Sequence, residues 1–386
     1  MAERRTGTRK RGQQGAFFDY TLLFIVLFLL GFGLVMLYSV SSYEANLDFG
    51  DSAYYLKKQL GATVFGLIVM MIVASIPYHF WERFATLGYL VSAVLILLII
   101  PFGRSAKGAK RWLNIMGISL PPAEVAKLAM ILFLASLVCH MGKGIRTTKG
   151  FFIMLLVPLP ISGMIYLITN NLSSAIIIFG IAVLMLFVAS PDYKKFILIA
   201  VAGIAVVALV IFMIVNAANS DGMGFRGERI LAWLDPEAYA SGKGFQTLQA
   251  LYAIGSGGIW GKGLGQSMQK LGFLPEAQND MIFSIICEEL GLFGAAAVVL
   301  LFILLIWRFM IIANNSPDLF GAMLVVGVMG HIAIQVILNI AVVTNTIPNT
   351  GISLPFISYG GSSVLFLLIE IGIVLSVGRG IRFKDL

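Results

Sequence analysis

The first candidates for chemistry in this chain are the ionisable residues that interrupt its long apolar stretches. Glu124 and Lys127 lie three residues apart at the start of one stretch, so a helix would place them on one face, where they can pair. Glu288 and Glu289 lie within another stretch. An ionisable side chain inside a membrane costs roughly 2.5–3.5 kcal/mol, so each is a candidate functional residue. The alternatives are a structural Glu124–Lys127 ion pair, and a structural role for Glu288 and Glu289 in bonding the backbone or Lys127.

Asp280 ends a polar segment that leads directly into a further apolar stretch. As a helix N-cap, its side chain would accept a backbone N–H at the start of the next helix. As a general base, it would take a proton from a substrate whose headgroup lies at the membrane–water boundary. These residues alone leave both interpretations open.

Other motifs point away from nucleotide, metal or disulfide chemistry. The glycine-rich segment 255–265 is not a Walker A loop, because Lys262 is followed by Gly263 and not by Ser or Thr, so we interpret it as a tight turn. The three histidines lie far apart without the spacing of metal ligands. Cys139 and Cys287 both lie inside apolar stretches, which excludes a disulfide framework.

The elements that must position these residues are membrane-spanning helices. Of 386 residues, 59% are hydrophobic and 12% charged, whereas soluble domains carry about 25% charged residues. Each long apolar stretch must be helical, because lipid cannot satisfy the backbone polar groups. The sequence predicts an all-α integral membrane protein with ten spans: Tyr20–Val40, Leu60–Ile76, Ala85–Phe102, Ala123–His140, Phe151–Thr169, Ala175–Ala189, Phe196–Val215, Met281–Met310, Leu319–Val343 and Ser363–Val377.

Basic residues in short loops set the expected orientation, because they concentrate on the cytoplasmic side. They predict a basic cytoplasmic tail over residues 1–17, a membrane domain over 18–378 and a second cytoplasmic tail over 379–386. Residues 216–280 then form a large extracytoplasmic loop between spans seven and eight, in which we expect short helices. The outer loop Gly103–Leu120 breaks the rule with four cations and no acid, which predicts an anionic ligand there. The overall excess of +8 indicates anionic lipid headgroups as partners, and not nucleic acid.

Several separated strings resemble the SEDS family of bacterial peptidoglycan glycosyltransferases, whose best-known members are FtsW and RodA. The strings lie at Gly33–Ser39, Gly108–Trp112, Pro122–Lys127, Ala253–Gly291 and Thr350–Ser363, in the order and spacing of the family. The segments Gly33–Ser39 and Asn339–Val343 are more similar to FtsW than to RodA. The chain departs from the family pattern at Pro121 and Ala123, at Asn170–Ser174, and at Gln278-Asn279 before Asp280.

The resemblance implies an enzyme that polymerises lipid II into glycan strands at the outer face of the bacterial cytoplasmic membrane. It implies an inverting reaction on a donor linked to undecaprenyl pyrophosphate, with Asp280 as the general base. Lys110 and Arg111 would neutralise the departing pyrophosphate. The implied substrate-binding residues are Lys110, Arg111, Trp112, Glu124, Lys127 and Glu288.

The implied partners are a class B penicillin-binding protein, which is a transpeptidase, and other membrane proteins of the division or elongation machinery. No cofactor is implied, and the sequence does not say whether a divalent cation assists. A flippase for lipid-linked precursors and a non-catalytic division scaffold remain alternatives. If Asp280 is structural, the base is to be sought at Glu276, Glu288 or Glu289.

Overall fold

A computed structural model describes residues 18–106, 109–115, 118–190, 192–217, 225–242 and 244–381. The predicted tail over 1–17 and most of the one over 379–386 lie outside these residues. Ten helical stretches within the described ranges are long and apolar enough to cross a membrane. This confirms the predicted multi-pass membrane fold.

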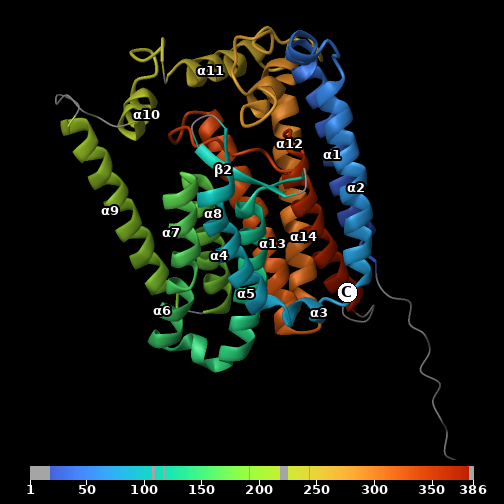
Figure 1. Cartoon of the computed structure of the whole chain (residues 1–386), viewed down its shortest axis with the longest axis vertical. Coiled ribbons are helices and arrows are strands. Elements are labelled where there is room, and N and C mark those ends of the chain that lie inside the picture. Colours follow the sequence, from blue (N-terminus) through green and yellow to red (C-terminus); the bar gives the residue numbers. More distant parts are fainter. Residues whose placement is uncertain are drawn as a thin grey trace, which may run out of the picture.

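The long helices run roughly side by side, and β2 (Ala109–Ile115), α10 (Phe225–Leu234) and α11 (Phe245–Gly257) lie at one end of the bundle (Figure 1). The helices are α1 (Tyr20–Phe49), α2 (Tyr54–Ser75), α3 (His79–Glu82), α4 (Ala85–Phe102), α5 (Pro122–Met141), a 3₁₀ turn (Gly142–Arg146), α6 (Thr148–Leu156), α7 (Pro158–Thr169), α8 (Leu172–Ala189), α9 (Tyr193–Ala217), α10 (Phe225–Leu234), α11 (Phe245–Gly257), α12 (Ile282–Asn314), α13 (Leu319–Val343) and α14 (Gly361–Arg379).

Two spans are less regular than their hydropathy suggests. The fifth consists of α6 and α7, which meet at Val157 just before a proline, and proline cannot continue a hydrogen-bonded helix. In α12 the backbone leaves the helical region at Gly291, with φ 66° and ψ −164°. A side chain at Gly291 would clash with the backbone of Ile259 and Gly261. The break therefore lets the outer loop contact α12 directly.

The outer end of the bundle differs from the all-helical prediction in one place. Residues of the loop Gly103–Leu120 form a small antiparallel sheet in the order β1 (Gly103–Ala106), β2 (Ala109–Ile115) and β3 (Ile118–Leu120). The short helices expected in the large loop are present as α10 and α11. The first helix is also longer than predicted, because it continues beyond Val40 to Phe49 and projects past the apolar stretch.

The middle of the bundle is formed by α13 and α14, which have the highest buried share of the ten spans. In contrast, α9 leans away from the other helices at the edge of the molecule (Figure 1), and none of its most apolar window is buried. The two described chain ends lie together opposite the outer loops, since the Arg379 guanidinium lies over the Phe18 ring at 5.4 Å. An even number of spans places both chain ends on the same side of the membrane.

Candidate functional site

Asp280 lies where the large outer loop enters the bundle. It is not the N-cap of α12, because Met281 occupies that position, without a capping hydrogen bond from its side chain. The N-cap interpretation is therefore wrong. Its backbone carbonyl accepts a 2.8 Å hydrogen bond from Asn339 Nδ2, which also donates to the Ile352 carbonyl at 2.7 Å. One buried amide on α13 thus holds the Asp280 segment against the segment that follows α13.

That second segment, residues 345–360, lies beside the Asp280 carboxylate. A β-carbon added at Gly351 would lie 3.5 Å from Asp280 Oδ2, and Gly351 has a φ of +68° that disfavours other residues. The Tyr359 N–H donates to the Gln278 carbonyl at 2.9 Å, so the two segments are also joined directly, two residues before Asp280. A glycine at position 351 keeps a side chain away from Asp280 Oδ2.

Two arginines from different outer elements supply positive charge near this carboxylate. Arg229 of α10 interacts electrostatically with Asp280, while burial lowers the pKa of its guanidinium. Burial also lowers the pKa of the Arg111 guanidinium on β2, and the positive charge of Arg229 lowers it further. Two cations that repel one another beside a cleft form a site that an anion would stabilise.

Arg111 is oriented by the end of a membrane helix. Its Nε and Nη2 donate to the carbonyls of Thr169 and Asn170 at 3.3 and 3.2 Å, where α7 ends. Arg111 is the extra residue of a β-bulge, because β1 pairs Ser105 with Lys110 and Arg104 with Trp112. Lys110 is the preceding residue of the strand. Its Nζ donates to the Ile100 carbonyl at 3.2 Å, near the end of α4. The Lys110 ammonium and the Arg111 guanidinium therefore bond the ends of different helices, α4 and α7, and Trp112 is 37% exposed.

The predicted Glu124–Lys127 pair is confirmed. Lys127 Nζ lies 2.8 Å from Glu124 Oε1, and the two side chains are only 13% (Glu124) and 2% (Lys127) exposed. Lys127 also donates to Gln335 Oε1 at 3.3 Å, and Gln335 Nε2 donates to the Ser353 carbonyl at 3.0 Å. The pair is therefore connected to the segment that borders Asp280.

Glu288 and Glu289 lie apart from this group and are both fully buried. Glu288 pairs with Lys262 at 2.6 Å and accepts from Ser267, while Glu289 pairs with Lys270 at 2.8 Å and accepts from Ser39. These contacts fasten the glycine-rich turn to α12 and α1. The partner of Glu288 is thus Lys262 and not Lys127, and its role as a substrate contact stays a prediction.

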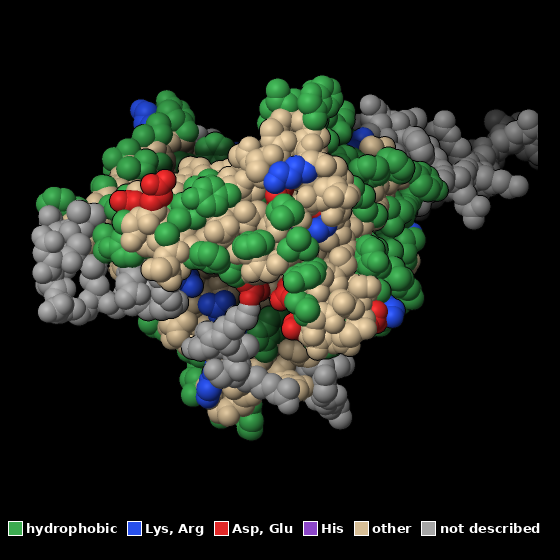
Figure 2. Space-filling view, turned by 90° about the horizontal axis from the view of Figure 1, so that it is seen from above, with side chains coloured by type: hydrophobic (Ala, Val, Ile, Leu, Met, Phe, Trp, Pro, Cys, Tyr) green, Lys and Arg blue, Asp and Glu red, His purple; other side chains and the backbone are tan. Residues whose placement is uncertain are grey.

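The outer face is hollowed near its middle, and acidic and basic side chains lie side by side at the rim (Figure 2). A polar pocket of about 260 Å³ lies next to Arg229, between α10, α11 and the segments at 275 and 349. Its polar lining includes Trp233, Gln246 and Asn349. Among the described residues, no group of three His, Cys, Asp or Glu side chains has the arrangement of a metal site.

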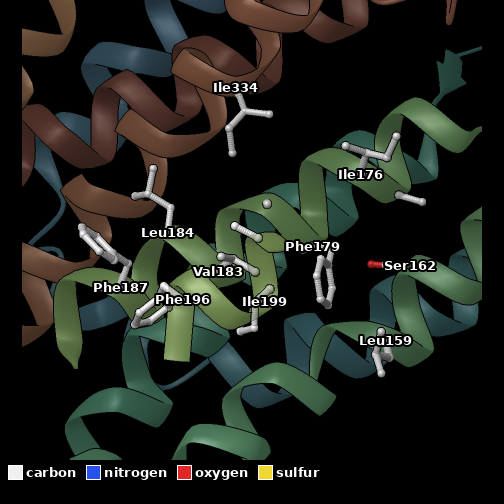
Figure 3. Close-up of a pocket in the computed structure, with 13 residues that line it drawn as sticks. Leu159, Ser162, Ile176, Phe179, Val183, Leu184, Phe187, Phe196, Ile199 and Ile334 are labelled. Atoms are coloured by element: carbon white, nitrogen blue, oxygen red, sulfur yellow. The ribbon is translucent and has the colours of Figure 1, made fainter. Parts of the chain in front are cut away.

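An apolar groove of about 790 Å³ runs along the membrane part of the same side, between α7, α8, α9 and α13. Phe179, Phe187 and Phe196 project into it with aliphatic side chains, and Ser162 is the one polar side chain labelled there (Figure 3). On α8 its lining begins at Ala175, two residues after Ser173, whose hydroxyl donates to the Thr350 carbonyl at 2.6 Å. The groove therefore starts close to the segment beside Asp280.

Sequence reasoning missed Arg229, Gln335 and Asn339. Arg229 lies in a charged, weakly apolar segment with no feature that distinguishes it from other surface cations. The two amides had a usable signal, because Gln335 and Asn339 are polar residues spaced one turn apart within an apolar helix.

Ten apolar helices that enclose buried ion pairs, with a carboxylate and two arginines at their polar end, define a multi-pass membrane protein with a polar site at one face. Residues 20–382 match the FtsW/RodA/SpoVE family of cell cycle proteins. The chain therefore belongs to this family.

Individual relatives match along nearly their whole length. The chain is 38% identical over 368 residues to stage V sporulation protein E of Bacillus subtilis, covering 95% of this chain and 98% of that protein. It is 37% identical over 371 residues to a probable peptidoglycan glycosyltransferase FtsW of Trichlorobacter lovleyi, covering 96% and 95%.

Solved structures of the family are also similar. A chain from a peptidoglycan synthase complex that coordinates polymerization and crosslinking matches with a TM-score of 0.76 and 25% identity, over 95% of this chain and 99% of that one. The rod shape determining protein RodA of Thermus thermophilus matches with a TM-score of 0.66 and 25% identity, over 95% and 98%. The relative named FtsW is thus more similar in sequence than this RodA, as predicted.

Proposed function

We propose that this protein is a peptidoglycan glycosyltransferase that polymerises lipid II into glycan strands at the outer face of the bacterial cytoplasmic membrane. The observation that carries the proposal is the position of Asp280. Its carboxylate lies at the outer end of the bundle, beside Gly351, which carries no side chain, and within electrostatic reach of Arg229. Family membership and a relative named for this activity support the same assignment.

The reaction is a direct displacement at the anomeric carbon of the donor sugar. Asp280 takes the proton of the acceptor 4-hydroxyl as that oxygen forms a bond to the anomeric carbon. The bond from this carbon to the pyrophosphate oxygen breaks, and its electron pair leaves with undecaprenyl pyrophosphate. One carboxylate is sufficient because the configuration inverts in a single step, from an α-linked donor to a β-1,4 product.

Arg111 and Arg229 stabilise the charge that develops on the leaving pyrophosphate. Arginine suits this role because its planar guanidinium offers paired donors to phosphate oxygens and stays charged when partly buried. The mutual repulsion of the two guanidinium groups in the absence of substrate falls when a dianion lies between them. The anionic ligand expected at the basic outer loop is thus the pyrophosphate. Arg111 binds it together with Arg229, and not together with Lys110 as the sequence suggested.

The apolar groove holds the polyprenyl chain of a lipid-linked substrate. Its lining of aromatic and aliphatic side chains matches such a chain, and its start beside Ser173 brings the lipid close to the segment next to Asp280. The polar pocket beside Arg229 is lined by Trp233, Gln246 and Asn349, which are side chains that hydrogen-bond and stack on sugars, so it is the place for the glycan.

The protein acts in cell division or elongation together with a class B penicillin-binding protein that cross-links the strands. The support is the similarity to a chain from a peptidoglycan synthase complex in which polymerization and crosslinking are coordinated. Both termini lie in the cytoplasm in this arrangement.

The test is polymerisation of purified lipid II by wild-type protein and by Asp280→Asn, with Glu276→Gln as the matched control. Asp280→Asn keeps the shape but removes the base, which typically costs about 10²–10⁴ in rate. Glu276→Gln changes a carboxylate of the same segment and keeps the rate within a few-fold. An Asn variant that polymerises at the wild-type rate excludes Asp280 as the base. An inactive wild-type protein, folded and with its transpeptidase present, excludes the proposed activity.

A further inference from the structure

A line of three polar side chains on α13 runs from the middle of the membrane to the Asp280 segment. His331, Gln335 and Asn339 follow one another at intervals of four residues, so they lie on one face of the helix. They are 0%, 4% and 0% exposed. We call these three residues the α13 stripe.

Each residue of the stripe bonds a different part of the protein. Asn339 holds the backbone of Asp280 and Ile352. Gln335 joins Lys127 to the Ser353 carbonyl. His331 lies deepest, with its Nδ1 at 2.8 Å from the carboxylate of Glu370 on α14 and its Nε2 at 3.0 Å from Gln335 Oε1. The stripe thus contacts the buried Glu370 on α14, the Lys127 ammonium and the backbone of Asp280.

The hydrogen bonds determine the orientation of each group. Gln335 Nε2 must face the Ser353 carbonyl, which only accepts, so its Oε1 faces Lys127 and His331. An amide oxygen cannot donate, so His331 Nε2 carries a hydrogen. The Nδ1 contact with Glu370 then holds one further proton, on the ring or on the carboxyl group, and the His331–Glu370 pair is neutral overall in either case.

Glu370 is fully buried, and so is its partner. Ionisable groups at this depth are costly unless they are fully satisfied, and removal of one partner leaves the other without compensation. A packing role alone would be filled at less cost by apolar residues of the same volume. What an apolar pair cannot do is supply a second donor to Gln335 Oε1, which holds the amide firmly between Lys127 and the Ser353 carbonyl.

We propose that His331 and Glu370 are positioning residues for the reaction, in that they fix the Gln335 amide and thereby hold Lys127 and the segment 351–354 in place beside Asp280. The proposal rests on the proposed function for its kinetic consequence, but its structural consequence does not depend on it. Glu370 anchors the histidine ring, the ring donates to Gln335, and Gln335 orients the ammonium group and the loop.

The first test compares Glu370→Leu, which removes the acceptor for His331, with Glu370→Gln, which retains a hydrogen-bonding partner for Nδ1. We expect Glu370→Leu to lower the polymerisation rate at saturating lipid II about tenfold to a hundredfold, with KM within about twofold. Glu370→Gln keeps at least about a third of the rate. The matched control is Arg308→Leu, which breaks the buried Arg308–Asp19 pair at the other end of the bundle and lowers the melting temperature without lowering the rate.

A second measurement does not require activity. Hydrogen exchange of peptides that span 276–281 and 351–359 reports whether the segments beside Asp280 are held, and the Tyr359 N–H bond to Gln278 provides a defined probe. We expect faster exchange in Glu370→Leu than in wild type, and wild-type exchange in these peptides for the control. If Glu370→Leu does not accumulate, Gln335→Asn shortens the amide by one methylene, keeps its polarity and should show the same faster exchange and reduced rate.

The double variant His331→Glu with Glu370→His distinguishes the positioning role from a role as a simple ion pair. A simple ion pair would be restored by the exchange. The proposal predicts no rescue, because the carboxylate introduced on α13 would face Gln335 Oε1 with a second acceptor. Rescue by the exchanged pair, or a wild-type rate with wild-type exchange in Glu370→Leu or Gln335→Asn, would overturn the positioning role. A wild-type protein inactive on lipid II would refute the proposed function alone, since the exchange data still decide the positioning role.

Discussion

Replacement of Arg229 by glutamine distinguishes a ligand-binding arginine from a structural one. Loss of a ligand-binding arginine should lower activity and leave stability unchanged, whereas loss of a structural one should lower stability. In the free protein, Arg229 lies close enough to Arg111 for its charge to lower the pKa of that guanidinium. Its hydrogen bond from Nη1 to the Asn349 carbonyl is 3.4 Å long and exposed. Among these neighbours, the one that favours its positive charge is Asp280.

The magnitude follows from these contacts. The relief of repulsion from Arg111 offsets the loss of a long, exposed hydrogen bond and of the attraction to Asp280, so the stability of Arg229→Gln should stay within about 0.5 kcal/mol of wild type. A charge-assisted bond to pyrophosphate is worth about 1.5–3 kcal/mol. The loss of that bond corresponds to a fall of about tenfold to 150-fold in kcat/KM for lipid II, at about 1.4 kcal/mol per factor of ten.

The assay is polymerisation of lipid II over a range of concentrations, with thermal unfolding in detergent on the same preparations. Lys57→Gln is the control, because Lys57 is an exposed cation of another outer segment that pairs with Asp51. We expect wild-type kinetics for Lys57→Gln. A stable Arg229→Gln protein with wild-type kcat/KM would refute the assignment, and a strongly destabilised one would show that Arg229 is structural.

Three further outcomes follow from individual contacts. Gly351→Ala should cost about 1 kcal/mol of stability because of its positive φ, and its methyl group beside Asp280 should slow polymerisation several-fold in the same assay. Glu289→Leu should lower the free energy of unfolding by about 3–5 kcal/mol, because Lys270 is left buried without its partner, and the added change Lys270→Met should restore most of it. In a protein with Cys139→Ser, single cysteines can be introduced near residue 6 or near residue 240. An impermeant thiol reagent added to intact cells should label the cysteine near 240 and not the one near 6.

The spans and the Glu124–Lys127 pair could be predicted because each depends on local physics. A stretch of apolar residues must be helical in lipid whatever its neighbours are, and residues three apart on a helix meet without help from the rest of the fold. The boundaries were less predictable where polar residues continue a helix beyond the membrane, as at Glu44 in α1. The kink at Gly291 depends on the approach of a loop about 30 residues earlier, which local hydropathy does not report.

The remainder of the site depends on long-range packing. The Asp280 surroundings combine α10, β2, the segment after α13 and one face of α13, and no spacing rule relates these parts. The small sheet around Arg111 was missed because its strands are short and contain glycine and lysine, which are uncommon in strands. Sequence reasoning therefore placed Lys110 and Arg111 together, whereas in the structure they bond the ends of different helices and the fold supplies Arg229.

The depth of the buried charges distinguishes the enzyme from a flippase for lipid-linked precursors, which needs a polar path through the whole bilayer. The α13 stripe ends at His331, near the middle of α13, and its partner Glu370 lies midway along α14. Beyond them, towards the cytoplasmic side, residues 320–330 of α13 contain no ionisable side chain, and residues 371–378 of α14 have a single polar one, Ser376, which bonds the Ile76 carbonyl. Within these two central helices, the polar groups therefore reach the Asp280 site from the middle of the bundle and open no path to the other side. In these two helices the polar groups therefore support a reaction site at one surface.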